Sequence, residues 1–260
     1  MPKVNIMDPV YFIRSLSRCI KYDAKGGKSR SAFCKVADDR FILKQVKSIE
    51  ISSFELFAPH YLKHVTKALE DKRPLTLAKI LGAYSIGFRN SRTGSSKRLD
   101  VLVMENLLYE HSTNKVFDLK GSMRSRFIDP SKESSGDVLL DENLQSICCN
   151  PVYVYPHSKC VLMQAILADT EFLAQNAIMD YSLLTCIDDS TGELVVGIID
   201  YIRTFTLDKR VEMFLKKTAG KTLPTVVYPK LYRKRFCEAM DKYFTVVPDK
   251  WTGLGADVKY

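Results

Sequence analysis

The chain has 260 residues, of which 46% are hydrophobic, and a formal net charge of +9. This length and apolar content allow a sizeable core, in one large domain or in two lobes. No window approaches the roughly 18 uncharged apolar residues of a membrane span, and the start lacks the long apolar segment of a signal peptide. The seven cysteines show no Cys-x-x-Cys spacing, which disfavours a zinc site or a disulfide framework and indicates reduced thiols in a cytosolic protein.

The first hundred residues alternate between helical and strand patterns. Asp8 can cap a first helix, Pro9 suits its first turn, and apolar residues then recur at helical spacing. In chain order, we expect a helix over 8–22, strands over 31–37 and 40–46, a helix over 48–69 with a bend near Pro59, and strands over 78–88 and 98–107. This order predicts a first lobe, over residues 1–105, in which helices accompany an antiparallel sheet.

The second part of the chain, residues 106–260, has a different character. We expect a helix over 157–178, a hairpin of strands over 181–187 and 194–200, and a helix over 229–244 whose first turn holds Pro229. This part is therefore predicted to be a mixed α/β lobe. The whole chain is predicted to be an α+β protein of two lobes without internal repeats.

A glycine-rich, basic turn joins the first helix to the first strand. There the backbone N–H groups of Gly27, Lys28 and Ser29 could approach phosphates between two strands. Glycine pairs are more often ordinary turns, and the stretch matches neither the P-loop nor the dinucleotide-binding pattern. The sequence of this turn is therefore only a weak indication that it binds phosphates.

The second expected strand carries one cation among apolar residues, Lys44 in the run Phe-Ile-Leu-Lys. A strand lysine is more often an ordinary surface residue. On the next helix, Glu50 shares a face with Phe54 and Phe57, so it should point inward. Kinases hold ATP phosphates with a strand lysine that pairs with a helix glutamate, so Lys44 and Glu50 are candidate nucleotide-binding residues.

The segment Val-Met-Glu-Asn-Leu ends the last strand of the first lobe, where a two-lobed nucleotide-binding protein needs a hinge. The backbone around Met104 and Asn106 could meet an adenine ring there. An ordinary strand end explains this segment equally well from sequence alone.

Two acids, Asp180 and Asp200, stand at the borders of apolar segments, where a bare charge is costly. Phosphoryl transfer needs a residue that orients the attacking hydroxyl group and a carboxylate that holds Mg²⁺ against the phosphates. A loop acid after a helix, followed by a hairpin that ends in a second acid, would supply both. We expect Asp180 to orient the nucleophile and Asp200 to bind the metal; each acid alone could equally cap a turn.

Most of the excess positive charge lies between Arg203 and Arg235, a window with ten basic residues and two acids. A charge run is often only a solvated face. This concentration also fits a polyanionic partner, either nucleic acid or an anionic membrane surface.

Several segments resemble the signature segments of the phosphatidylinositol phosphate kinases, and most closely those of the PIKfyve-type enzymes. They are Asp-Leu-Lys-Gly-Ser at 118–122, Ile-Met-Asp-Tyr-Ser-Leu-Leu at 178–184 and Gly-Ile-Ile-Asp at 197–200. The resemblance extends from about residue 26 to residue 254. It implies a two-lobed lipid-kinase fold that uses ATP and magnesium to convert phosphatidylinositol 3-phosphate into the 3,5-bisphosphate, peripherally on endosomal membranes from the cytoplasm.

The resemblance also implies roles for individual residues. Lys44 would bind ATP phosphates, Asp180 would be the catalytic acid and Asp200 the metal ligand, with Lys120 as a further catalytic cation. The basic stretch would be the activation segment, whose cations Lys216, Lys217 and Lys221 would bind the lipid headgroup. Protein kinases have a metal-binding Asn five residues after the catalytic Asp, but that position is Thr185 here, so a second metal lacks its usual ligand.

Two other hypotheses compete with an active lipid kinase. A catalytically inactive module of the same fold could use the basic segment to bind phosphoinositides or anionic membranes, but such a module does not need both acids. Nucleic-acid binding through the same charge is poorly supported, because the aromatic residues lack the spacing of a stacking platform and no recognition helix or zinc pattern is present.

Overall fold

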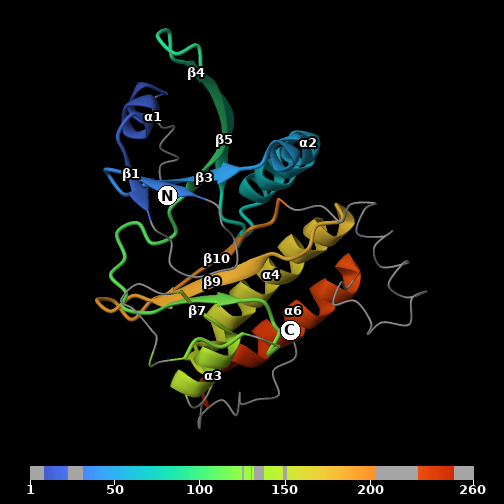
Figure 1. Cartoon of the computed structure of the whole chain (residues 1–260). Helices are drawn as coiled ribbons and strands as arrows, with labels where there is room; N and C mark the ends of the chain where they lie inside the picture. The colour runs from blue at the N-terminus through green and yellow to red at the C-terminus, as the bar shows by residue number, and fades with distance from the viewer. Residues whose placement is uncertain are drawn as a thin grey trace, which may run out of the picture.

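The computed structural model describes residues 9–22, 32–124, 126–129, 131, 138–148, 151–202 and 228–248. The elements of the N-terminal part are α1 (Pro9–Leu16), β1 (Cys19–Tyr22), β2 (Phe33–Val36), β3 (Phe41–Val46), α2 (Ser48–Glu70), β4 (Ile80–Arg89) and β5 (Ser96–Glu105). The C-terminal part contains β6 (Val116–Leu119), β7 (Val138–Leu139), α3 (Asp141–Cys148), β8 (Val152–Val154), α4 (Pro156–Gln175), β9 (Ser182–Ile187), β10 (Leu194–Ile199), α6 (Pro229–Tyr243) and β11 (Phe244–Val246). Figure 1 shows the two parts stacked as an upper and a lower lobe.

The N-terminal lobe is built on an antiparallel sheet with the strand order β1-β2-β3-β5-β4. Leu102 and Val103 are neighbours in β5 and therefore point to opposite faces. Leu102 joins the large core against which α2 packs, whereas Val103 joins a small cluster completed by Phe12 of α1. The two helices thus lie on opposite faces of the sheet, and Lys44, which stands opposite Leu102 in the register, lies on the α2 side.

The start of the chain differs from the expected helix over 8–22. Helix α1 ends at Leu16, and Cys19–Tyr22 forms β1, which pairs with β2 from Cys19↔Val36 to Tyr22↔Phe33. The ladder to β2 is a non-local interaction that the helical spacing of residues 10–20 does not reveal. The expectation for the second helix was closer, because α2 is continuous from Ser48 to Glu70 and includes Pro59.

The C-terminal lobe contains a mixed sheet with the order β10-β9-β6-β7, in which only the β6–β7 pair is parallel. Helices α4 and α6 pack together beneath this sheet, and β11 pairs with β8. The predicted α+β class and the mixed α/β second lobe are therefore confirmed. None of the helices in the described ranges combines the length and the apolar character that crossing a bilayer requires.

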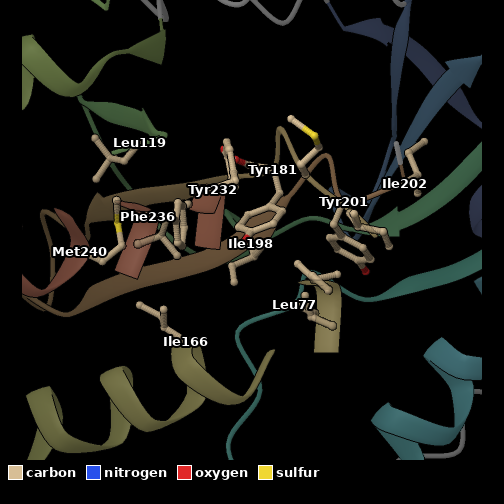
Figure 2. Close-up of a cluster of buried hydrophobic side chains, with 14 of the residues drawn as sticks. Leu77, Leu119, Ile166, Tyr181, Ile198, Tyr201, Ile202, Tyr232, Phe236 and Met240 are labelled. Carbon is tan, nitrogen blue, oxygen red and sulfur yellow. The ribbon is translucent and has the colours of Figure 1, made fainter. Parts of the chain in front are cut away.

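One large apolar core extends through both lobes. Figure 2 shows Tyr181 beside Ile198, with Tyr232 and Phe236 of α6 nearby. The rings of Tyr181 and Phe236 meet edge to face with centroids 5.0 Å apart, a favourable arrangement for aromatic pairs. The segments on either side of the acids Asp180 and Asp200 are thus fixed by deep burial, since Tyr181 and Ile198 are fully buried.

The segment that leads from α2 to β4 is attached to the C-terminal lobe. Asp169 of α4 is fully buried and accepts hydrogen bonds from the backbone N–H and the hydroxyl of Thr76, at 2.6 and 2.8 Å. His64 of α2 lies 2.7 Å from the same carboxylate. Thr76 and Ala78 exchange backbone hydrogen bonds with Ile198 of β10, at 2.6 and 2.9 Å.

The turn between β9 and β10 is organised by Asp188, which is almost fully buried. Its carboxylate accepts hydrogen bonds from the hydroxyl and backbone N–H of Ser190, at 2.5 and 2.8 Å, and lies 2.7 Å from Nδ1 of His111. These contacts, that of the Ser190 hydroxyl first, hold the pKa of Asp188 well below the ordinary value for an aspartate. The turn therefore depends on an ionised carboxylate.

Candidate active site

Three chain segments meet at one edge of the C-terminal sheet. The register pairs Ile199 with Ser182 and Leu119 with Leu183. Asp180 lies two residues before Ser182, Asp200 follows Ile199, and Lys120 follows Leu119. Strand pairing alone therefore brings three of the predicted site residues, which are up to 80 positions apart in sequence, to the same end of the sheet.

Lys44 forms an ion pair with Asp200, so the N-terminal lobe contributes a charge to the same edge. The lysine is only 5% exposed, and its ammonium group also lies 5.8 Å from the centroid of the Phe33 ring. A buried ammonium group needs a charged partner, and here the partner comes from the other lobe. The contact joins the strand cation and one of the two predicted acids at the junction of the lobes.

Asp180 and Asp200 both adopt left-handed backbone conformations, with φ of +67° and +62°. Such conformations cost non-glycine residues roughly 1–3 kcal/mol and cluster at functional sites. In Asp180 the backbone is held in place, because the ammonium group of Lys120 donates a hydrogen bond to its carbonyl oxygen at 2.7 Å. The next carbonyl, that of Tyr181, accepts a hydrogen bond from the hydroxyl of Tyr232.

The segment around Lys120 is fixed by a second buried carboxylate, that of Asp141. It accepts hydrogen bonds from the backbone N–H groups of Lys120 and Gly121, the latter at 2.8 Å, and from the hydroxyl of Tyr243 at 3.0 Å. It also accepts a bond from Nε of Arg126 at 2.8 Å. This carboxylate therefore binds the main chain on which Lys120 stands.

Arg126 links Asp141 to Asp118 of β6, whose carboxylate lies 2.8 Å from the guanidinium group. Burial lowers the pKa of Arg126, but the charges of Asp118 and Asp141 outweigh this effect and leave its pKa raised. Gly121 has φ of +64°, and a Cβ atom there would lie 2.8 Å from Cβ of Ala239 in α6. The turn that presents Lys120 therefore requires glycine for both its conformation and its packing.

The structure does not pair Glu50 with Lys44. Glu50 lies in the first turn of α2, and its carboxylate accepts a hydrogen bond from the backbone N–H of Lys47 at 2.9 Å. The free N–H groups at a helix start attract such carboxylates. The partner of Lys44 in this structure is Asp200 instead.

The predicted hinge residues lie at the end of β5. Met104 is part of the strand and stands opposite Ile42 and Ile80. The side chain of Asn106 donates a hydrogen bond to the carbonyl of Asp39 at 2.7 Å, and its backbone N–H donates one to Arg40 at 2.9 Å. In this structure Asn106 thus fixes the exit of the chain from the sheet.

Six of the predicted site residues lie outside the described ranges: Gly27, Lys28, Ser29, Lys216, Lys217 and Lys221. Sequence reasoning missed Asp141, Arg126 and Asp169, which hold the site in position. Asp169 had a readable signal, because it lies on the same face of α4 as Ile166 and Leu173. The pattern around Asp141 indicates only an acid at a helix start.

A magnesium ion fits the donor set at this edge. Mg²⁺ is usually held by one or two carboxylates together with waters and substrate phosphates, not by a cage of protein ligands. Asp200 offers one partly exposed carboxylate, and the described residues contain no group of three or more His, Cys, Asp or Glu side chains suited to a metal. Thr185 stands at the position of the metal-binding Asn of protein kinases, five residues after Asp180, and its hydroxyl group donates a hydrogen bond to the carbonyl of Val195 at 3.2 Å.

The family model described as phosphatidylinositol-4-phosphate 5-kinase matches residues 16–194 and 188–243 of the chain. The chain belongs to this family of lipid kinases. It is 57% identical, over 252 residues, to the human 1-phosphatidylinositol 3-phosphate 5-kinase, and this match covers 94% of the chain and 12% of the human protein. A 1-phosphatidylinositol-3-phosphate 5-kinase of Arabidopsis thaliana is 45% identical over 93% of the chain and 14% of its own length.

The 1-phosphatidylinositol 3-phosphate 5-kinase of Saccharomyces cerevisiae is 46% identical over 92% of the chain and 11% of its own length. The chain thus spans about an eighth of the length of the curated relatives it matches. These comparisons confirm the predicted family and the predicted likeness to its 3-phosphate 5-kinase members. Membership in a kinase family also implies the use of ATP.

Proposed function

We propose that the chain is the catalytic part of a phosphoinositide kinase. It transfers the γ-phosphate of ATP to the 5-hydroxyl group of phosphatidylinositol 3-phosphate and forms phosphatidylinositol 3,5-bisphosphate. The single observation that carries the proposal is the convergence of Lys44, Asp180 and Asp200 at one edge of the C-terminal sheet. Three relatives that bear the name of this activity, at 45–57% identity, support the choice of substrate.

In the proposed reaction, Lys44 would bind the phosphates of ATP, and Asp200 would hold Mg²⁺, which would supply positive charge beside the transferred phosphoryl group. Asp180 accepts a hydrogen bond from the 5-hydroxyl group and orients its oxygen toward the γ-phosphate. The ion pair between Lys44 and Asp200 holds both side chains in place until the nucleotide separates them. Glu50 would have to leave its contact with the backbone N–H of Lys47 before it could support Lys44 in the nucleotide-bound enzyme.

Lys120 is a positioning residue in this scheme, because its ammonium group bonds to the main chain of Asp180 and not to its carboxylate. Asp180 has a left-handed backbone conformation and is partly exposed, whereas the next residue, Tyr181, is fully buried. A carboxylate held in this way loses little freedom when the substrate binds, which is the advantage of a preorganised site.

The remaining contacts of the proposed enzyme follow from the family. Gly27, Lys28 and Ser29 would approach the ATP phosphates, and the backbone near Met104 and Asn106 would meet the adenine ring. Lys216, Lys217 and Lys221 would bind the phosphorylated headgroup. The enzyme would work peripherally on endosomal membranes from the cytoplasm and would bind no nucleic acid.

The test is phosphate transfer in vitro. Purified protein is incubated with each monophosphorylated phosphoinositide in vesicles, together with magnesium and labelled ATP, and the product isomer is identified. We expect labelled 3,5-bisphosphate from the 3-phosphate, and we expect Asp200→Asn to abolish it. Asp189→Asn, which changes an exposed acid in the turn between β9 and β10, is the matched control and should retain turnover.

A second pair of variants separates nucleotide use from membrane binding. Lys44→Met should lose ATP-dependent transfer and still bind vesicles, whereas Lys35→Met, which removes a partly exposed cation from the same sheet, should keep both. If the wild-type protein transfers no phosphate to any phosphoinositide, the proposed function is wrong, and vesicle binding alone would then favour an inactive module of the same fold.

A further inference from the structure

The β4–β5 hairpin extends beyond the rest of the N-terminal lobe (Figure 1). We define the arm as residues 82–99, which comprise most of β4, the turn and the start of β5. Its ladder continues to the pair Arg89↔Ser96 at the tip. Near its base, the buried carboxylate of Asp100 accepts hydrogen bonds from Ser48 of α2 and Ser85 of β4, at 2.9 and 2.5 Å, so the arm is anchored to the body of the lobe.

One face of the arm presents apolar side chains to solvent. Tyr84, Ile86 and Phe88 alternate along β4 and therefore share a face, and they are 43%, 47% and 57% exposed. Ile86 stands opposite Leu99, which continues the same face on β5. Helix α1 covers this side of the sheet only lower down, where Phe12 packs against Phe41 with ring centroids 5.3 Å apart. A continuous apolar stripe of this kind usually marks an interaction surface.

The arm is also strongly basic. Residues 82–99 include Arg89, Arg92, Lys97 and Arg98 and no acid. Arg98 pairs with Asp100 at 3.1 Å, whereas the other three cations have no ion partner within the described part of the chain. An open hollow of about 370 Å³ at the end of the arm is lined by Phe88 together with Arg89, Lys97 and Arg98.

We propose that the arm is a membrane-contact element that binds an anionic lipid bilayer, with its apolar stripe entering the interface and its cations meeting the headgroups. Apolar side chains beside basic ones are the combination that such an interface binds. This element lies in a different part of the sequence from the basic segment over 203–227. The proposal rests on the proposed function only in that the substrate is a membrane lipid; the binding itself needs no turnover.

Helix α2 provides a contrast within the same lobe. It also exposes apolar residues, Leu56 at 81% and Leu62 at 59%, but the acids Glu50 and Glu55 lie on the same helix. Negative charge there opposes an anionic surface. The helix carries three acids, with Glu70 as the third, against the two cations Lys63 and Lys67, whereas the arm carries four cations and no acid.

The experiment measures binding of the 260-residue protein, without ATP, to vesicles of phosphatidylcholine alone and of phosphatidylcholine mixed with phosphatidylserine. Two double variants divide the contributions: Ile86→Ser with Phe88→Ser, and Arg92→Gln with Lys97→Gln. The matched control is Leu56→Ser with Leu62→Ser on α2. All substitutions lie at exposed positions, and unchanged thermal unfolding checks that each variant keeps its fold.

We expect the charge variant to lose about fivefold in affinity per cation for the phosphatidylserine vesicles, with a weaker dependence on salt than the wild type. The apolar variant should lose at least about tenfold, and the α2 control should match the wild type. All three should phosphorylate a short-chain, water-soluble phosphatidylinositol 3-phosphate at the wild-type rate.

Wild-type binding by both arm variants would overturn the proposal. So would a wild-type dimer that the arm variants convert into monomers without any change in vesicle binding, because the stripe would then be an interface between two copies. Absence of turnover on the soluble substrate in the wild type would instead count against the proposed function and leave the binding result intact.

Discussion

Replacing Asp141 by Asn tests whether this buried carboxylate holds the turn that presents Lys120. The carboxylate is fully buried, and its side chain accepts hydrogen bonds from two backbone N–H groups, from the hydroxyl of Tyr243 and from Arg126. An amide of the same shape keeps one acceptor and turns a donor toward one of these donors. Hydrogen bonds to charged groups contribute about 1.5–3 kcal/mol each, and removal of one partner from a buried ion pair costs about 3–5 kcal/mol.

We therefore expect Asp141→Asn to lower the free energy of unfolding by about 3–5 kcal/mol. In a chain of this size, that loss corresponds to a fall in melting temperature of roughly 10 °C. Urea unfolding at pH 7 measures it, and Glu142→Gln, the neighbouring acid on α3, is the matched control. That control should lie within about 0.5 kcal/mol of the wild type.

The double variant Asp141→Asn with Arg126→Met sharpens the test. If the ion pair between Asp141 and Arg126 is the main contribution, the two losses should not add, because the first substitution already breaks the contact that the second would remove. The reasoning is refuted if Asp141→Asn is as stable as the wild type. It is also refuted if the losses from the two substitutions are strictly additive, because the guanidinium and the carboxylate would then act independently.

Three further predictions concern the site and the turn beside it. Lys120→Met should reduce kcat by about a hundredfold with little change in the KM for ATP, because the main chain of Asp180 loses its support. Steady-state kinetics measures both constants. A change in KM alone would contradict the positioning role of Lys120. Gly121→Ala should destabilise the fold by roughly 1–3 kcal/mol in urea unfolding, since alanine is strained at positive φ and meets Ala239. The pKa of Asp188 is lowered in the folded state, so its carboxylate stabilises the fold above the ordinary aspartate pKa of about 4, and this stabilisation is lost as the pH falls below that value. The difference in unfolding free energy between the wild type and Asp188→Asn should therefore shrink from pH 6 toward pH 3. A constant difference would exclude the ionised carboxylate as the cause.

Local sequence patterns were sufficient to single out Lys44 and the two acids as candidate site residues, and the structure brings Lys44 and Asp200 together. An isolated cation in an apolar strand, and an acid at the end of one, are visible without a structure. The pairing of Lys44 with Asp200 was not, because it joins residues 156 positions apart through the packing of two lobes. Glu50 illustrates a different limit: its spacing from Phe54 and Phe57 indicates an inward face, but the start of α2 at Ser48 gives its carboxylate a role at the helix end.

The secondary structure likewise divides into elements that local sequence patterns predict and elements that depend on contacts with distant residues. The strands and helices that carry their own periodicity, such as β3, α2 and β10, were predicted close to their observed bounds. Strand β1 was predicted as helix, since its strand character comes from β2 and not from its own residues. Short strands such as β7, β8 and β11 gave no signal, because two or three residues cannot express a period.

The attachment of Thr76 and Ala78 to Ile198 limits how the lobes can move. Ile198 lies two residues before Asp200, and both of its backbone polar groups bond to the segment that enters β4. A rotation of the upper lobe that left β10 behind would break two buried hydrogen bonds, and leaving such groups unpaired costs about 1–3 kcal/mol each. Because β10 also pairs with β9, this link opposes relative motion of the two lobes at the point where Lys44 meets Asp200.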